Sequence, residues 1–186
     1  YLCGITFWRD LKLKVTNKVL IPRPETELIV DIVFNIFRKK SEKLFFAELG
    51  TGSGAISIAL ALAYPFSEGV ATDIDQDALE IANKNFINSS KQSNLKFYCG
   101  NWWSPLESFK GKLDLAISNP PYIPKDTYEK LPKEVKNFEP KVALLGGEDG
   151  LKHIREIIQK APLFLKENGW LILENHFDQS EKVKQL

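Results

Sequence analysis

The feature that most constrains this 186-residue chain is a regular alternation of short apolar runs and longer amphipathic stretches. From about residue 44 onward, the runs have the length of strands and the stretches have the length of helices. The predicted strands are Leu44–Glu48, Gly69–Thr72, Leu95–Tyr98, Leu113–Ser118 and Trp170–Glu174, and the predicted helices are Ala55–Ala63, Gln76–Ser89, Gly150–Lys166 and a last one from Gln179. Such alternation favours a parallel sheet covered on both faces and joined by right-handed crossovers. The sequence therefore predicts a doubly wound, mostly parallel α/β fold.

The N-terminal part of the chain has a different character. Ile5–Trp8 and Leu11–Val15 alternate loosely between apolar and polar residues, which is typical of a β-hairpin. Pro24 and the acidic residues that follow it suit the first turn of a helix. That helix is predicted to run to about Lys40, with its apolar residues on one face.

The two ends of the sequence indicate a piece of a longer protein. The chain contains no Met, even at position 1, and it stops inside the helix after the fifth strand of the predicted sheet. Doubly wound domains of this type usually continue with further strands. We therefore expect a hairpin and linker over residues 1–23 and a cofactor-binding domain over residues 24–186, truncated at both ends and without its last strands.

Composition limits the possible partners. Hydrophobic residues make up 44% and charged residues 26%, as in ordinary soluble proteins. The net charge of +1 provides no general attraction to nucleic acid or to an anionic membrane. Neither the two cysteines nor the two histidines stand in a metal-ligand or disulfide pattern. We expect a cytoplasmic monomer with free thiols, no metal, no membrane segment and no direct contact with nucleic acid.

A glycine-rich loop after the first strand of the sheet is the first candidate ligand site. Its three glycines let the backbone turn sharply and allow a ligand to approach closely. The N-terminus of the following helix favours a negative group such as a carboxylate. Asp73 ends the next strand, where a carboxylate can accept hydrogen bonds from both hydroxyls of a ribose. The pattern predicts a cofactor that contains a nucleoside.

Two kinds of cofactor fit this loop. Gly50, Gly52 and Ala55 match the fingerprint of nicotinamide-dependent enzymes, so a dehydrogenase is the rival interpretation. Glu48, just before the loop, would repel a pyrophosphate but attract the ammonium group of S-adenosylmethionine. Trp102 follows the third strand of the sheet and is a candidate to stack on the adenine, with burial in the core as its alternative.

The tetrapeptide Asn119-Pro120-Pro121-Tyr122 follows the fourth strand of the predicted sheet. Each proline fixes its own φ and disfavours the α region for the residue before it. The Asn119 amide oxygen and the Pro120 carbonyl are therefore expected at the strand end, where open α/β sheets bind ligands. Together they could accept both hydrogens of a planar NH2 group while the Tyr122 ring packs on its flat face. An ordinary proline-rich turn is the alternative. This motif has no role in hydride transfer and favours S-adenosylmethionine.

These motifs together resemble the release factor glutamine methyltransferase family, which modifies the glutamine in the Gly-Gly-Gln loop of class-1 peptide chain release factors. The resemblance extends along nearly the whole chain. It includes Val19–Glu27, the glycine loop, the tetrapeptide, Phe138-Glu139-Pro140 and Gly146–Leu151. The tetrapeptide alone is shared with adenine and guanine amino methyltransferases, whereas the flanking segments are more specific.

The resemblance implies a Rossmann-like class I methyltransferase fold, S-adenosylmethionine as the cofactor and a class-1 release factor as the protein substrate. It implies that the catalytic residues, which meet the target glutamine, are Asn119, Pro120, Pro121 and Tyr122. Together with the residue arguments above, it gives a cofactor-binding set that consists of Glu48, Gly50, Thr51, Gly52, Ser53, Gly54, Asp73, Trp102 and Asn119.

The chain also departs from the family pattern. Asn101 stands where the family usually has Asp, Glu174-Asn175-His176 differs from the usual sequence after the fifth strand, and the family's N-terminal helical domain is not in the sequence. Two alternative functions stay open. One is an amino methyltransferase that acts on a flipped nucleic acid base, and the other is a non-catalytic subunit that binds the cofactor.

Overall fold

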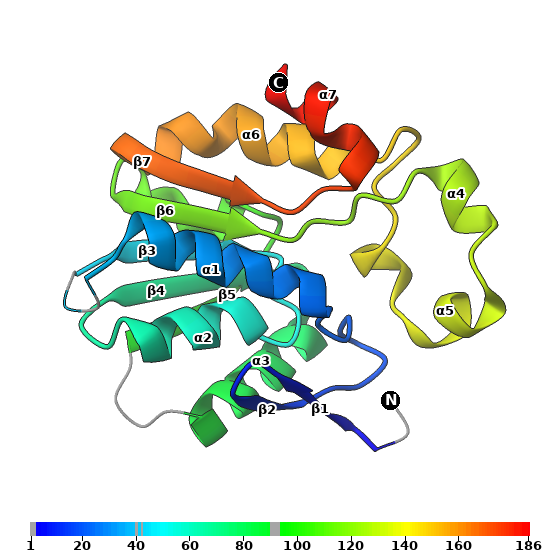
Figure 1. Cartoon of the computed structure of the whole chain (residues 1–186), viewed down its shortest axis with the longest axis horizontal. Coiled ribbons are helices and arrows are strands. Elements are labelled where there is room, and N and C mark those ends of the chain that lie inside the picture. Colours follow the sequence, from blue (N-terminus) through cyan, green and yellow to red (C-terminus); the bar gives the residue numbers. More distant parts are fainter. Residues whose placement is uncertain (1–2, 40, 42, 90–93) are drawn as a thin grey trace.

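A five-stranded parallel sheet forms the centre of the protein (Figure 1). The computed structural model describes residues 3–39, 41, 43–89 and 94–186. The sheet has the order β5-β4-β3-β6-β7, and every neighbouring pair in it is parallel. Its strands are β3 (Phe45–Leu49), β4 (Glu68–Asp73), β5 (Asn94–Cys99), β6 (Leu113–Ser118) and β7 (Leu165–Leu173). The predicted doubly wound, mostly parallel fold is confirmed.

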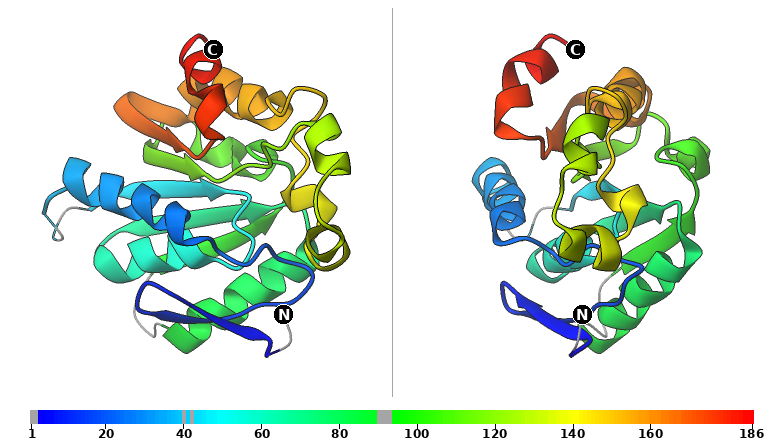
Figure 2. Two further views of the ribbon diagram at one scale, coloured as in Figure 1. Left: turned by 45° about the vertical axis from the view of Figure 1, so that its right-hand side comes forward. Right: turned by 90° about the vertical axis from the view of Figure 1, so that its right-hand side faces the viewer.

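Helices cover both faces of the sheet, as the right-hand view of Figure 2 shows. Phe46 packs with α1 (Glu27–Ile36) and α2 (Ala55–Ala63), whereas the next residue, Ala47, packs with α6 (Lys152–Phe164) and the 3-10 segment Ser104–Phe109. Because successive side chains along a strand point to opposite faces of the sheet, they belong to two separate apolar layers. Helix α3 (Gln76–Ser89) connects β4 to β5 and borders the N-terminal hairpin.

The order of the strands places a switch point between β3 and β6. From β3 the chain builds outward through β4 to β5, and then returns to the other side of β3 to add β6 and β7. Connections that leave two adjacent parallel strands in opposite directions open a crevice at the carboxyl ends of those strands. Both the glycine loop after β3 and the tetrapeptide after β6 lie at this crevice.

A two-stranded hairpin, β1 (Ile5–Trp8) with β2 (Leu11–Lys14), packs against the sheet domain. Asn85 of α3 attaches it. The Asn85 side chain accepts a hydrogen bond from the Lys14 N–H at 2.7 Å and donates to the Lys14 carbonyl at 3.0 Å. Its amide also donates to the carbonyl of Ser53 in the glycine loop at 2.8 Å. One buried amide therefore joins the hairpin, α3 and the glycine loop.

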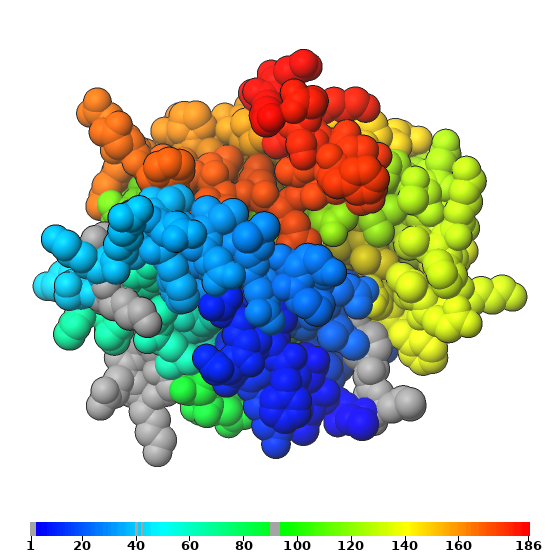
Figure 3. Space-filling model, in the orientation of Figure 1, coloured from blue at the N-terminus to red at the C-terminus, as the bar shows by residue number. Residues whose placement is uncertain are grey.

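A small lobe, residues 123–145, stands out between β6 and α6 and was not predicted. It contains α4 (Lys125–Glu129), α5 (Lys133–Phe138) and a 3-10 turn, Lys141–Ala143. A β-bridge between Ile123 and Leu145 closes its base. In Figure 3 this yellow-green lobe stands beside the blue N-terminal part of the chain. Its helices are too short to show the periodic apolar pattern from which a helix is predicted.

Several predicted boundaries were wrong, two of them by four or five residues. Helix α1 ends at Ile36 rather than near Lys40, which itself lies outside the described residues. Strand β7 begins at Leu165 rather than Trp170, because the strand continues through an irregularity in which Asn168 adopts φ +63°. An Asn-Gly pair usually marks a turn, and here it lies where the register of β7 against β6 shifts. Of the helices in the described ranges, none has the length and apolarity needed to cross a membrane.

We predict that Asn85→Ala lowers the free energy of unfolding by about 1–3 kcal/mol, because it leaves the half-buried main-chain groups of Lys14 and the buried carbonyl of Ser53 without their partners. Urea denaturation measures this change. Asn83→Ala, on the exposed side of the same helix, is the matched control and should be nearly neutral. Equal stabilities for the two variants would show that Asn85 does not attach the hairpin.

Candidate active site

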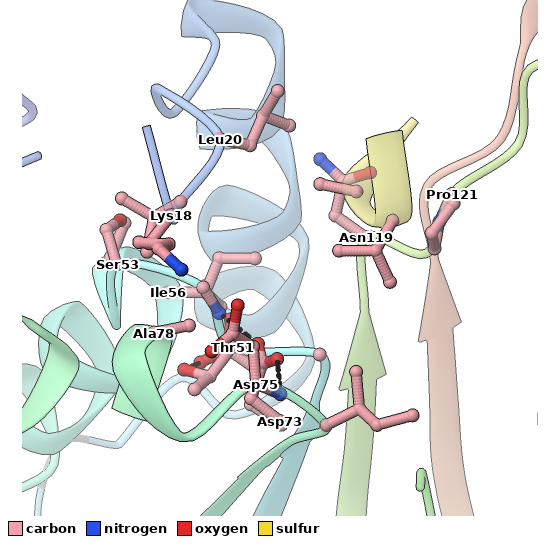
Figure 4. Close-up of a pocket in the computed structure, with 18 of the residues that line it drawn as sticks. Lys18, Leu20, Thr51, Ser53, Ile56, Asp73, Asp75, Ala78, Asn119 and Pro121 are labelled. Carbon is pink, nitrogen blue, oxygen red and sulfur yellow. Dashed lines mark hydrogen bonds between the residues drawn. The ribbon is translucent and has the colours of Figure 1, made fainter. Parts of the chain in front are cut away.

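The crevice at the carboxyl edge of the sheet contains a cavity of about 150 Å³, which we call the glycine-loop cavity. Its walls come from the glycine loop, the ends of β4, β5 and β6, and residues 18–22 of the linker. Figure 4 shows Thr51, Asp73 and Asp75 gathered in one part of this cavity, with Asn119 and Pro121 in another. Segments far apart in the sequence therefore share one site.

Glu48 is a buried acid in the wall of this cavity, with only 2% of its surface exposed. One of its oxygens accepts hydrogen bonds from the Thr51 hydroxyl at 2.5 Å and from the Ser57 N–H at 3.0 Å. Burial raises the pKa of Glu48 to about 7, and these hydrogen bonds only partly oppose that rise. The protein thus holds a carboxyl group that ionises near neutral pH and would gain from a positive ligand.

Asp73, at the end of β4, shapes the glycine loop as well as the cavity. Its carboxylate accepts hydrogen bonds from the Gly52 N–H at 2.8 Å and from the Asp75 N–H at 3.0 Å. Burial raises the pKa of Asp73 above its ordinary value. The predicted position at the strand end is confirmed, and each oxygen keeps lone pairs for a further donor.

The main-chain N–H groups of the glycine loop are largely used within the protein. Those of Gly50 and Thr51 donate to the Thr72 carbonyl, that of Gly52 to Asp73, and that of Gly54 to the Thr51 carbonyl. A pyrophosphate needs such N–H groups to point toward it. Lys18, the one lysine among the described residues that line the cavity, forms an ion pair with Asp77 at 2.8 Å. The cavity is therefore better suited to a cation than to a polyanion.

Trp102 forms an aromatic wall beside Gly50. A Cβ atom at Gly50, which has φ +73°, would lie 3.0 Å from the Trp102 ring, so this close approach needs glycine. The indole N–H of Trp102 donates to Glu156 at 3.1 Å, and the ring lines the glycine-loop cavity. Trp103, in contrast, is buried and stacks on Phe164. Of the two interpretations of Trp102, a cavity wall or a core residue, the structure shows the cavity wall.

A second cavity, of about 220 Å³, lies next to the first. The tetrapeptide contributes Asn119 and Tyr122 to it, the linker contributes Arg23, and the β6–α6 lobe supplies most of the remaining wall. Leu20, Asn119 and Ala143 line both cavities. The two cavities therefore share a part of their walls that includes Asn119.

The Asn119 amide is held from the N-terminal side of the chain. Its Nδ2 donates a hydrogen bond to the Thr26 hydroxyl at 3.2 Å, and Thr26 is 4% exposed. Since the nitrogen of the amide is directed at Thr26, the oxygen lies on the opposite side and can accept from another group. Pro120 is buried and lines neither cavity, whereas Pro121 lines the first.

Tyr122 is held from the C-terminal side. Its hydroxyl donates to Glu174 at 3.2 Å, and its carbonyl accepts from the Gln179 side chain at 2.9 Å. Burial first and then the Glu174 charge raise the pKa of Tyr122 to about 12. The phenol therefore stays protonated at neutral pH, so it fixes the ring in place and does not act as a base.

The structure brings the predicted residues together, and it adds others that sequence reasoning missed. Every predicted cofactor residue except Gly54 lines the glycine-loop cavity. The missed residues are Thr26, Ser57, Arg23, Glu139, Glu174 and Gln179, which either hold a predicted residue or line the second cavity. Within the described part of the chain, no group of three or more His, Cys, Asp and Glu could hold a metal.

The sheet order and the position of the cavities are those of a Rossmann-like methyltransferase fold. A crystal structure of an S-adenosylmethionine-dependent methyltransferase from Agrobacterium tumefaciens matches with a TM-score of 0.65 at 15% identity, over 96% of this chain and 56% of the other. The methyltransferase small domain family matches residues 28–134. The chain belongs to that family.

Curated relatives are similar over the whole chain. A release factor glutamine methyltransferase of Prochlorococcus marinus is 43% identical over 190 residues, and one of Coxiella burnetii is 44% identical over 186 residues. Both alignments include 100% of this chain but only 64% and 65% of the relative. The chain thus spans about two thirds of the length of these proteins.

We predict that Glu48 makes the stability of the protein fall with rising pH. Because the pKa of Glu48 is about 7 in the folded protein and ordinarily 4.5, the folded state binds a proton that the unfolded chain releases. The stabilisation is complete below about pH 4.5 and is lost as the pH rises through 7, for a total of about 3 kcal/mol.

Urea denaturation at pH 5 and pH 8 measures this effect. Glu48→Gln cannot titrate, so the difference in unfolding free energy between the two pH values should shrink in the variant. An undiminished difference would show that Glu48 is not the group responsible.

Proposed function

We propose that the protein binds S-adenosylmethionine in the glycine-loop cavity and methylates the side-chain amide nitrogen of a glutamine in a peptide chain release factor. The observation that carries this proposal is the position of Asn119. It belongs to the part of the wall that the two cavities share, with its amide nitrogen held by Thr26 and the oxygen available to a substrate NH2 group. A group-transfer enzyme needs adjoining donor and acceptor sites of this kind.

The electrostatics of the glycine-loop cavity support the choice of cofactor. Glu48, Asp73 and Asp75 line it, and its lysine is paired with Asp77. Glu48 would accept from the ammonium group of the cofactor, which would favour the ionised carboxylate. Asp73 would accept from the ribose hydroxyls, and Trp102 offers an aromatic face to the adenine. A pyrophosphate would meet these carboxylates and few free N–H groups.

The residues of this chain would align and activate the amide nitrogen. When bound, S-adenosylmethionine supplies an electrophilic methyl group on a sulfonium. An amide nitrogen is a poor nucleophile because its lone pair is delocalised into the carbonyl. Asn119 Oδ1 would accept one N–H group and favour a more tetrahedral nitrogen, while Tyr122 would pack on the amide plane. The predicted second acceptor, the Pro120 carbonyl, belongs to a residue that lines neither cavity. Proximity and aimed dipoles would supply most of the rate gain.

The choice of substrate rests on the relatives. The proteins from Prochlorococcus and Coxiella are named release factor glutamine methyltransferases, and they align with both the glycine loop and the tetrapeptide because they match the whole chain. Methylation of an amino group on a nucleic acid base is the competing substrate class for the same tetrapeptide. Incubation with labelled S-adenosylmethionine, release factor and nucleic acid separates the two: label in nucleic acid alone would overturn the proposal.

We predict that S-adenosylmethionine raises the melting temperature of the protein and that NAD does not. A ligand at one hundred times its Kd stabilises the folded state by about 2.7 kcal/mol, which corresponds to a shift of about 5–10 °C for a domain of this size. Differential scanning fluorimetry measures the shift. A shift with NAD and none with S-adenosylmethionine would instead support a dehydrogenase.

We predict that Asn119→Ala lowers the rate of methyl transfer to release factor by about 10²–10³, because it removes an acceptor aimed at the reacting nitrogen. Cofactor affinity, measured by calorimetry, separates this loss from a binding defect at the shared wall. Asn119→Asp keeps the size and an acceptor and should retain part of the rate. Near-normal turnover of Asn119→Ala with saturating cofactor would show that the tetrapeptide is an ordinary turn without a catalytic role.

A further inference from the structure

The second cavity contains an ion pair that the proposed reaction does not use. Arg23 of the linker donates to Glu139 of the β6–α6 lobe at 2.5 Å, across 116 positions of sequence. Both residues line the cavity together with Asn119 and Tyr122. Such an ion pair can stabilise the cavity wall or bind the substrate. The exposed fraction of each partner indicates which role it has.

The two partners of this pair are buried to different extents. The Glu139 side chain is 9% exposed, whereas the Arg23 side chain is 42% exposed. The second oxygen of Glu139 has no hydrogen-bond partner among the described residues and is buried. If Arg23 were absent, the protein would bury an uncompensated carboxylate, so Glu139 holds the guanidinium firmly. Glu139 thus anchors Arg23.

Arg23 keeps donors available after this anchoring. A guanidinium carries five N–H groups in a fixed planar fork, and the bond to Glu139 uses one terminal nitrogen. The main chain at Arg23 is fixed as well, because its carbonyl accepts from the Trp8 indole at 2.8 Å. Three residues further on, Thr26 holds Asn119. Arg23 and the Asn119 amide are therefore positioned by one short segment.

We infer that Arg23, anchored by Glu139, donates to a main-chain carbonyl of the substrate segment that carries the target amide, and so acts as a specificity-determining residue. This inference rests on the proposed function. A peptide presents main-chain carbonyl oxygens on both sides of a protruding side chain, and a guanidinium can donate to them.

The chemistry of the amide argues for a main-chain carbonyl and against the oxygen of the target amide itself. A cationic donor on that oxygen would draw the nitrogen lone pair further into the carbonyl and make the nitrogen less nucleophilic. A donor on a neighbouring main-chain carbonyl adds affinity without that penalty. The exposed side chains of Phe138 and Val142, 55% and 53% exposed on the same lobe, offer apolar contact to the flanking residues of such a segment.

The first experiment compares steady-state kinetics on release factor. The double variant Arg23→Gln/Glu139→Gln replaces the ion pair by a neutral amide pair and avoids burying a lone carboxylate. We expect its KM for release factor to rise about 10-fold to 100-fold, as for the loss of a charged hydrogen bond. The kcat, the cofactor affinity and the melting temperature should change little, which a merely structural role would not allow.

The matched control is Lys125→Gln/Glu148→Gln. It removes an exposed ion pair of 3.0 Å next to the same lobe, and neither residue lines a cavity. Its KM should equal that of the unmodified protein. Equal KM values for the control and the Arg23/Glu139 variant, with methylation of release factor observed, would overturn this inference and leave the proposed function standing. Absence of any methylation by the unmodified protein would overturn both.

The second experiment locates the carbonyl. Peptides containing Gly-Gly-Gln receive a thioamide, which is a weaker hydrogen-bond acceptor, at one main-chain position at a time. One main-chain thioamide should raise KM about 10-fold with the unmodified protein and have no further effect with Arg23→Gln/Glu139→Gln. If only a thioamide in the target side chain shows this dependence on Arg23, the guanidinium binds the target oxygen and the inference fails.

Discussion

The pairing of β3 with β6 is the constraint on which the rest of the site depends. In that register Glu48 lies opposite Ile117, so Asn119 follows only two residues beyond the partner of the buried acid. Because the strands are parallel, both chains leave the sheet at the same edge, and the switch in strand order opens a crevice between them. The acidic end of one cavity and the amide in the wall shared by both are thus placed together by backbone hydrogen bonds.

Segments outside the sheet complete the site by holding these strand-end groups. Thr26 fixes the Asn119 amide from the N-terminal side, and Glu174 with Gln179 fixes Tyr122 from the C-terminal side. Each contact is a polar bond to a buried or half-buried group, so losing one partner leaves the other unsatisfied. The tetrapeptide is therefore clamped from both sides, and the positions of its acceptors do not depend on proline stiffness alone.

Burial sets the charge state of the site. Glu48 and Asp73 both have a raised pKa because the cavity wall withdraws them from water. Glu48, whose pKa is raised to about 7, gains from a ligand of opposite charge, since binding favours its ionised form. Glu139 is also shielded from solvent, and its buried carboxylate holds the guanidinium of Arg23 in place.

The local pattern of residues was sufficient to predict the layers, the direction of the sheet, the glycine loop and the tetrapeptide. Hydrophobic period, glycine and proline act within a few residues of their own position, and β6 was predicted with its observed bounds. The register shift around Asn168, the short helices of the lobe and the bonds from Thr26, Arg23 and Gln179 were not predictable in this way. The three bonds join groups that lie 57 to 116 positions apart in the sequence. Only the tertiary structure decides which distant groups meet.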